Sequence, residues 1–305
     1  MGRWRVAAAA LAVAASVDVG RGQAPPPAPP APVVAASTTD LRDLVAAVGG
    51  ERVRVESLTD PRHDPHAREI HPRQLTLLRS AELLVRVGLD HEPWLARALR
   101  AGRRPPHDLD GSREVELLGT ETPRLRADAR PHVHAFGNTH YWLDPENARP
   151  LTAAIVRALA ALRPDDRPIF EVNRTRFLAR LDAALPRWKA RLAPWAGSRV
   201  VVVHDTWPYF ARRFDLVIAA AVEERPGVPP SPAYLAALME RMKATGVRVI
   251  IAEPGAAGPL LRRLAADTGA RVVTLAPSVG SDPEATDYLT LFEVNVRRLA
   301  EAFGG

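Results

Sequence analysis

The sequence has 305 residues, 47% of them hydrophobic and 25% charged, with no cysteine and a formal net charge of +6. This length suits about two domains, and the mild, dispersed basic excess disfavours a nucleic-acid-binding protein, which would carry a clustered basic stripe. The lack of cysteine excludes disulfide scaffolds, thiolate metal sites and a lipid-modified cysteine within this sequence, so any metal chemistry must use His, Asp and Glu.

The first 32 residues read as a targeting segment. Residues 1–24 contain Arg3 and Arg5 before the apolar run 6–15. That run is shorter than the roughly 20 residues needed to span a bilayer, and the pattern is typical of a secretory signal peptide. A buried, Ala-rich helix is the alternative. Residues 25–32 are Pro-rich and predict an extended tether. We therefore expect an exported periplasmic protein without a lipid anchor.

Residues 33–164 alternate between strand and helix patterns. Val33–Ala36 is a short apolar strand, followed by a Ser/Thr/Asp cap cluster and helical spacing over residues 41–48. The expected elements that follow are a strand at 52–57, a helix at 72–82 and a strand at 83–87. A β-α-β-α order predicts a parallel sheet flanked by helices.

A long helical pattern separates this lobe from a second one. Residues 165–194 are assigned to a linking helix, which at 1.5 Å per residue reaches roughly 40 Å. In residues 195–305 we expect strands at 199–203, 216–219, 247–252 and 271–275, with helices at 231–244 and 287–303. The fold class is therefore α/β, with two lobes that each contain a parallel sheet and are joined by one long helix.

Three histidines carry the predicted chemistry. His204 directly follows a four-Val strand, and ligands of open α/β sheets bind at the carboxyl ends of the strands. His66 lies in a Pro-bounded loop after the second strand of the first lobe, and His140 lies in an aromatic, Pro-bracketed loop. Neutral imidazole suits Zn(II) well and Mn(II) less well. These rings can meet only if the two lobes face each other.

Four motifs occur in an order that resembles a known family. They are Asp64-Pro-His66, Asn138-Thr-His-Tyr-Trp-Leu-Asp-Pro145, His204-Asp-Thr-Trp-Pro-Tyr-Phe210 and Asp287-Tyr-Leu…Asn295-Val. The sequence is similar, from about Val33 to Phe303, to the zinc- and manganese-binding periplasmic proteins that feed ABC importers. The resemblance implies a metal site in the cleft between the lobes, with ligands His66, His140 and His204. A third histidine is typical of the zinc-binding members.

The resemblance also implies a fourth, acidic ligand in the loop before the last helix. Here that loop reads Leu275-Ala-Pro-Ser-Val-Gly280, so Pro277 stands where the carboxylate is expected. Asp282 is the predicted substitute if the loop bends inward. Glu253, at the end of a strand, is another carboxylate at the same edge, and water is a further alternative.

Residues near the predicted ligands are candidates for supporting roles at the metal site. Trp142, Trp207 and Tyr209 are expected to wall the site, while Asp144 and Asp205 are candidates to orient imidazoles, with helix capping as the alternative for Asp144. His132 and His134 are candidates to capture or relay metal, although an ordinary exposed loop is the favoured interpretation. The remaining histidines receive no site role: His63, His71, His91 and His107.

The predicted function is capture of Zn(II) and its delivery to an ABC importer permease by a monomeric protein that is not an enzyme. A periplasmic zinc metallochaperone is a candidate second partner. A manganese-binding member is the main alternative. A three-His zinc hydrolase with Glu253 as general base is the rival of another class, but the sequence lacks a compact His-Glu-x-x-His motif. An adhesin or metallophore-binding protein on the same scaffold is a third possibility.

Overall fold

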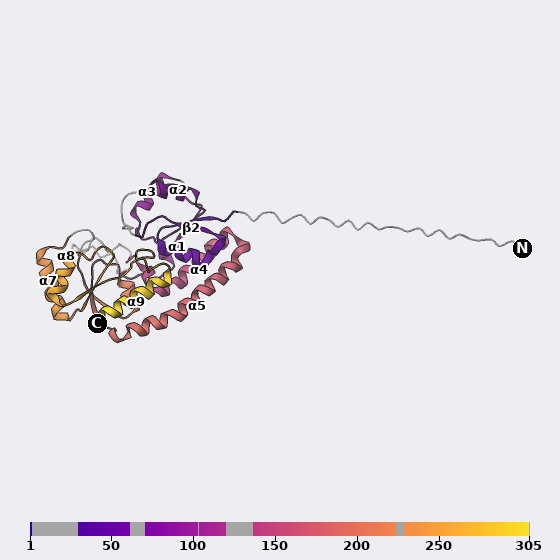
Figure 1. Ribbon diagram of the computed structural model, residues 1–305. Helices are drawn as coiled ribbons and strands as arrows, with labels where there is room; N and C mark the ends of the chain where they lie inside the picture. Colours follow the sequence, from indigo (N-terminus) through magenta and orange to yellow (C-terminus); the bar gives the residue numbers. More distant parts are fainter. Residues whose placement is uncertain (2–29, 62–70, 103, 120–136, 224–228, 305) are drawn as a thin grey trace. The chain divides into compact units, whose positions relative to one another are not determined.

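Each half of the chain builds a four-stranded parallel sheet in this computed structural model (Figure 1). The structure describes Met1 and residues 30–61, 71–102, 104–119, 137–223 and 229–304. The first sheet contains β1 (Val33–Ala36), β2 (Arg54–Ser57), β3 (Leu83–Arg86) and β4 (His107–Asp110). The second contains β5 (Arg199–Val202), β6 (Val217–Ala221), β7 (Val249–Ala252) and β8 (Arg271–Thr274).

The two sheets have the same strand order, β2-β1-β3-β4 and β6-β5-β7-β8, with every neighbouring pair parallel. In each sheet the chain first adds a strand on one side of the first strand and then crosses to the other side. The reversal lies between β1 and β3 in one lobe and between β5 and β7 in the other. Open α/β sheets bind ligands at the carboxyl ends of such strand pairs. The strand order therefore defines one candidate ligand position in each lobe.

Helices flank both sheets, and many of them begin at residue types that favour the start of a helix. The first lobe contains α1 (Thr39–Gly49), α2 (Pro72–Ser80), α3 (Pro93–Ala101) and α4 (Ala148–Leu162), and α5 (Arg167–Leu192) follows. The second lobe contains α6 (Pro208–Arg213), α7 (Pro232–Thr245), α8 (Pro259–Thr268) and α9 (Tyr288–Gly304). Five of these helices start with Pro, whose fixed φ and missing N–H suit the first helical turn. Thr38 and Ser231 cap α1 and α7 through their hydroxyl oxygens.

The expected linking helix is present as α5, which is 26 residues long (Figure 1). It contacts α1 and α4 of the first lobe and α9 of the second. Its buried side chains, Phe170, Phe177, Leu181 and Trp188 among them, enter the same hydrophobic cluster as residues of both sheets. Because one helix packs against both lobes along its length, it holds them as a continuous unit.

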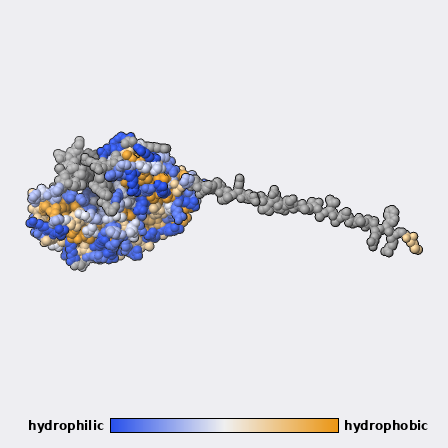
Figure 2. Space-filling view, turned by 45° about the horizontal axis from the view of Figure 1, so that its top comes forward, coloured by the Kyte–Doolittle hydropathy of each residue, from blue (hydrophilic) through white to orange (hydrophobic). Residues whose placement is uncertain are grey.

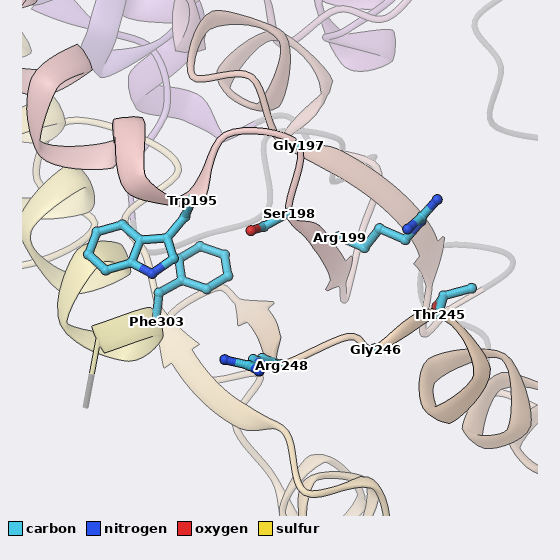
Figure 3. Close-up of a pocket in the computed structure, with 8 residues that line it drawn as sticks. All are labelled: Trp195, Gly197, Ser198, Arg199, Thr245, Gly246, Arg248 and Phe303. Carbon is cyan, nitrogen blue, oxygen red and sulfur yellow. The ribbon is translucent and has the colours of Figure 1, made fainter.

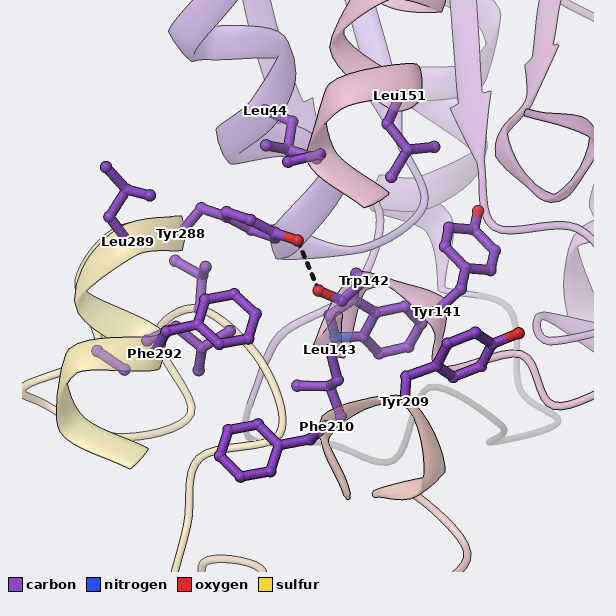
Figure 4. Packing of buried hydrophobic residues seen from close by; sticks show 14 of the residues in the cluster. Leu44, Tyr141, Trp142, Leu143, Leu151, Tyr209, Phe210, Tyr288, Leu289 and Phe292 are labelled. Atoms are coloured by element: carbon purple, nitrogen blue, oxygen red, sulfur yellow. Dashed lines mark hydrogen bonds between the residues drawn. The ribbon is translucent and has the colours of Figure 1, made fainter. Parts of the chain in front are cut away.

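Aromatic residues from both lobes meet in one buried core (Figure 4). Trp142 comes from the first lobe, whereas Phe210, Tyr288 and Phe292 come from the second. The Tyr288 hydroxyl donates a hydrogen bond of 2.6 Å to the Trp142 carbonyl, which Figure 4 shows as a dashed line. Each buried aromatic ring removes on the order of 150–250 Å² from water. The lobes therefore share a buried hydrophobic interface near the predicted site.

The outer surface in the view of Figure 2 is mostly hydrophilic, with scattered hydrophobic patches. In the part of the chain that the structure describes, the large apolar side chains classed as exposed are Met1, Ile169, Val172, Val217 and Leu260. None of the helices in that part combines the length and apolarity that crossing a membrane requires.

One buried carboxylate, Asp40, and one partly buried carboxylate, Asp43, form hydrogen bonds across the interface. Asp40 Oδ1 accepts a hydrogen bond of 2.9 Å from the Val279 amide, and Asp43 Oδ2 accepts one of 2.8 Å from the Tyr288 amide. Asp40 is fully buried, and its other oxygen has no hydrogen-bond partner among the residues that the structure describes. Burial, together with the nearby charge of Asp43, raises the pKa of Asp40 to about 7 against hydrogen bonds that lower it.

This pKa predicts a specific pH dependence of stability. Folded Asp40 keeps a proton that the unfolded chain releases, so its contribution is present below about pH 4 and is lost as the pH rises to about 7. Asp40→Asn cannot titrate there. We expect the free energy of unfolding of the wild type to fall relative to Asp40→Asn across this range, by roughly 2–4 kcal/mol. Urea denaturation of both proteins over pH 4–8 measures this difference, and parallel pH curves would contradict it.

Candidate metal centre

His204 lies just beyond the carboxyl end of β5, at the reversal point of the second sheet. Its Nδ1 is 3.3 Å from Glu223 Oε2, which is an ion-pair distance without hydrogen-bond geometry, and Glu223 follows the neighbouring strand β6. The amide of Glu223 donates a 3.1 Å hydrogen bond to the Val203 carbonyl, which holds this residue beside the His204 loop. A carboxylate at Nδ1 favours the tautomer that carries its proton there. His204 Nε2 is then the nitrogen with a lone pair for a metal ion.

His140 is the residue before a short 3-10 turn, Tyr141–Leu143, and its ring is fixed by Asn138. Asn138 Oδ1 accepts hydrogen bonds from the His140 amide at 2.9 Å and stands 3.1 Å from His140 Nδ1. The amide oxygen can only accept, so Nδ1 carries the proton and Nε2 has the lone pair. The same tautomer therefore results at His140 and at His204.

Asn138 also joins the two histidine loops. Its Nδ2 donates a 2.8 Å hydrogen bond to the carbonyl of Asp205, the residue after His204. Because that partner is a carbonyl, it also fixes which end of the Asn138 amide faces His140. The Tyr209 hydroxyl donates to the Asn138 carbonyl at 3.0 Å. One side chain thus holds a loop of the first lobe against a loop of the second.

Glu253 follows β7 at the same edge as His204. Trp207 Nε1 donates a 2.9 Å hydrogen bond to Glu253 Oε1, while Oε2 is buried without a hydrogen-bond partner among the described residues. Burial raises the pKa of Glu253, whereas the charge of nearby His204 and the Trp207 hydrogen bond lower it. Trp142, Trp207 and Tyr209 are all almost completely buried. The expected aromatic surroundings are therefore present at these loops.

Asp282 has a different partner from the one that the sequence suggests. Arg298 on α9 binds both of its carboxylate oxygens, at 2.6 and 3.1 Å, and the Glu284 amide donates to one of them at 3.0 Å. Arg298 holds the pKa of Asp282 below its ordinary value. Among the described residues no three His, Asp or Glu side chains form a group able to hold an ion. Asp282 as a fourth metal ligand stays a prediction, and an ion there would have to compete with Arg298 for the carboxylate.

The structure also shows the contacts of Asp144 and Asp205, the two candidates to orient imidazoles. Asp144 does not orient an imidazole: it caps the turn at Pro145–Asn147 through the Glu146 amide and forms an ion pair with Arg213. The Asp205 carbonyl accepts a hydrogen bond from Asn138 Nδ2, and its carboxylate lies 3.5 Å from the same nitrogen. The groups that orient the rings are Asn138 and Glu223. The predicted ligand His66 lies outside the described residues, as do three further histidines: His63, His132 and His134.

The sequence motifs assign no role to His91, yet its ring lies beside that of His140. The two ring centroids are 5.4 Å apart, and the His91 and Trp142 centroids are 5.1 Å apart. His91 is fully buried and follows β3, at the reversal point of the first sheet. The sequence offers one signal, a histidine shortly after a predicted strand. The position of β3 in the sheet, which gives that signal its meaning, is not readable from the sequence.

A separate cavity of about 210 Å³ opens at the amino-terminal edge of the second sheet (Figure 3). Its lining includes Arg199 at the start of β5, Arg248 just before β7, and the stacked rings of Trp195 and Phe303. His204 follows the opposite end of β5. This cavity is therefore not part of the candidate metal centre.

Two parallel sheets of one strand order, joined through a long helix, define a two-lobed solute-binding protein. Residues 34–302 match the family described as "Zinc-uptake complex component A periplasmic". The chain belongs to this ZnuA family.

Individual relatives agree with this assignment. A "High-affinity zinc uptake system protein ZnuA" of Paracoccus denitrificans (strain Pd 1222) is 27% identical over 228 residues, which cover 67% of this chain and 70% of that protein. A crystal structure of ZnuA is similar with a TM-score of 0.75 and 28% identity, covering 90% of this chain and 99% of that one. The binding protein FpvC of Pseudomonas aeruginosa, solved with Mn²⁺, has a TM-score of 0.76 at 22% identity, covers 90% of this chain and 98% of that one, and supports the fold alone.

Proposed function

We propose that this chain captures Zn(II) between its two lobes and delivers it to the permease of an ABC importer. The proposed ligands are His66 and His140 of the first lobe and His204 of the second. The observation that carries this proposal is the Asn138 side chain, which orients His140 and contacts the residue after His204 in the other lobe. The protein acts as a binding protein and not as an enzyme.

The oriented tautomers support capture of a cation. His140 and His204 both direct Nδ1 to an oxygen acceptor, so both retain Nε2 for the ion. Tetrahedral zinc sites use this nitrogen at about 2.0–2.1 Å, with an acceptor behind each ring. Zinc is the cargo and must also leave. The shared aromatic core and the Asp40 and Asp43 contacts favour small lobe movements over wide hinge opening.

The remaining features of the proposal follow the sequence. Residues 1–24 are a signal peptide and residues 25–32 a tether, so the protein is exported to the periplasm without a lipid anchor. Residues 33–164 form the first lobe, 165–194 the link and 195–305 the second lobe. The partner is the permease, with a periplasmic metallochaperone as a possible zinc donor. The protein acts as a monomer without nucleic acid, which agrees with the small number of exposed apolar side chains in its described part.

Metal analysis tests the choice of cargo. Protein purified without chelator is expected to contain about one zinc per chain, and in competitive titration zinc should displace manganese. The physical reason is that imidazole nitrogen suits Zn(II) better than Mn(II), which prefers oxygen ligands. Stoichiometric manganese that zinc fails to displace would contradict the zinc assignment, whereas no metal at all would contradict capture itself.

Pro277→Asp tests why zinc is preferred. The Pro277 carbonyl accepts a 3.0 Å hydrogen bond from Trp142 Nε1, and the Trp142 and His140 ring centroids are 5.3 Å apart. An added carboxylate at position 277 would supply a hard oxygen ligand next to Trp142, whose ring packs against His140. We expect manganese affinity to rise relative to zinc affinity, by about tenfold or more. Ser278→Asp is the matched control, and an equal change in both variants would contradict the assignment of position 277.

A further inference from the structure

We propose that His91 is a direct metal ligand that binds the same ion as His140. This inference rests on the proposed function, because it concerns the ion that the protein captures. It adds to the site an imidazole that neither the sequence motifs nor the family resemblance assigns. It also provides a nitrogen donor in a chain whose loop carries Pro277 in place of the acidic ligand.

The separation of the two rings fits a shared ion. The centroids of His91 and His140 are 5.4 Å apart, with ring planes at 88°. Two imidazoles on one tetrahedral ion, each with its nitrogen at about 2.0–2.1 Å, have centroids roughly 5 Å apart. The observed spacing is therefore close to that of a bound pair, and only a small adjustment of either ring is needed to close on a metal.

The hydrogen bonds behind the rings leave the same nitrogen for the ion. His91 Nδ1 is 2.9 Å from Thr139 Oγ1, and His140 Nδ1 is 3.1 Å from Asn138 Oδ1. Thr139 and Asn138 precede His140 in one loop, so the same segment supports both rings from behind. Asn138 Oδ1 can only accept, whereas the Thr139 hydroxyl can accept or donate. In the tautomer in which Nδ1 donates, Nε2 is the metal-binding atom of each histidine.

The backbone before His91 contains three consecutive residues with positive φ. Gly88, Leu89 and Asp90 all have positive φ, at 82°, 55° and 58°. A Cβ at Gly88 would lie 2.1 Å from Asp110 Oδ1, so only glycine fits there. Leu and Asp in the left-handed region cost on the order of 1 kcal/mol each, and such strain is concentrated at functional sites. This turn delivers His91 to the reversal point of the first sheet, beside His140.

A purely structural His91 is the competing explanation. The ring packs edge-on against Trp142 as well as His140, and a buried ring in this place also fills space. The two roles differ in one observable. A ligand forms a nitrogen–metal bond, whereas a packing residue forms none and affects metal affinity only through the shape of the pocket.

Nuclear magnetic resonance of the cadmium-loaded full chain distinguishes the two roles. With nitrogen-labelled histidine, each ring nitrogen bonded to cadmium shows a one-bond scalar coupling to the metal. We expect couplings to Nε2 of both His91 and His140, and His91→Phe should remove only the first. The exposed His107 provides the matched control His107→Phe, which should change neither coupling.

The outcomes separate this inference from the function on which it rests. Cadmium coupled to His140 but not to His91 would overturn the inference and leave the proposed capture intact. A chain that binds neither cadmium nor zinc would contradict both. In zinc titrations His91→Phe is expected to lower affinity by about tenfold or more. Because the wild-type couplings already decide the question, the test does not depend on the variant folding well.

Discussion

Asp144→Ala is expected to destabilise the protein by about 3–5 kcal/mol. The Asp144 side chain is 1% exposed, and its two oxygens accept hydrogen bonds from Arg213 at 2.6 and 2.8 Å. The first oxygen also accepts from the Glu146 amide, and Arg212 lies 3.6 Å from the second. Alanine leaves the Arg213 guanidinium, whose side chain is 23% exposed, without its closest anion. An unpaired buried charge is costly because it has lost water without gaining a counter-charge.

This ion pair joins the segment after His140 to helix α6 of the second lobe, so the loss should also loosen the lobe interface. Urea denaturation at pH 7 measures the free energy of unfolding. Asp182→Ala is the matched control, because Asp182 also pairs with an arginine but is 56% exposed. Exposed pairs contribute at most about 1 kcal/mol. Similar losses in the two variants would contradict a special role for the buried pair.

His204→Ala is expected to lower zinc affinity by at least about tenfold. His204 is the proposed ligand from the second lobe, so its loss leaves the ion held by the first lobe alone. Competitive titration against a chromophoric chelator measures the change. The folded state should be unaffected to within about 1 kcal/mol, because the side chain is only partly buried.

Glu223→Gln is a second variant, for which a smaller loss of zinc affinity is expected. It keeps the size of the side chain 3.3 Å from His204 Nδ1 but removes the charge that favours the metal-binding tautomer. The affinity should therefore fall by less than in His204→Ala. His107→Ala controls for the loss of an exposed histidine. Zinc binding that is unchanged in His204→Ala would remove this residue from the site.

Much of the fold could be predicted because its signals are local. The strand at Val33–Ala36, the cap residues before α1 and the four strands of the second lobe are all found close to their expected positions. Helix α5 is found within residues 165–194 because its apolar spacing is uninterrupted. Strand β4 (His107–Asp110) was missed. Asp108 and Asp110 make it look like a loop, yet in the structure both pair with Arg86 of the neighbouring strand.

The candidate site could be predicted only in part, because its partners are distant in sequence. Asn138 binds its own neighbour His140, but its second contact, with Asp205, crosses 67 residues. The position of His91 depends on the strand order and on three residues with left-handed backbone conformation. Of these, only Gly88 is a residue type from which the sequence predicts that conformation. The prediction for Asp282 did not include Arg298, which lies 16 residues later on α9 and binds the same carboxylate.

A crystal structure of the zinc-loaded protein, with the ion located by anomalous scattering, tests the central claim most directly. We expect one ion about 2.0–2.1 Å from Nε2 of His140 and from Nε2 of His204, with Nδ1 of His140 hydrogen-bonded to Asn138 and Nδ1 of His204 facing Glu223. Zinc bound by residues of one lobe alone, with either of these two rings turned away from it, would contradict the account.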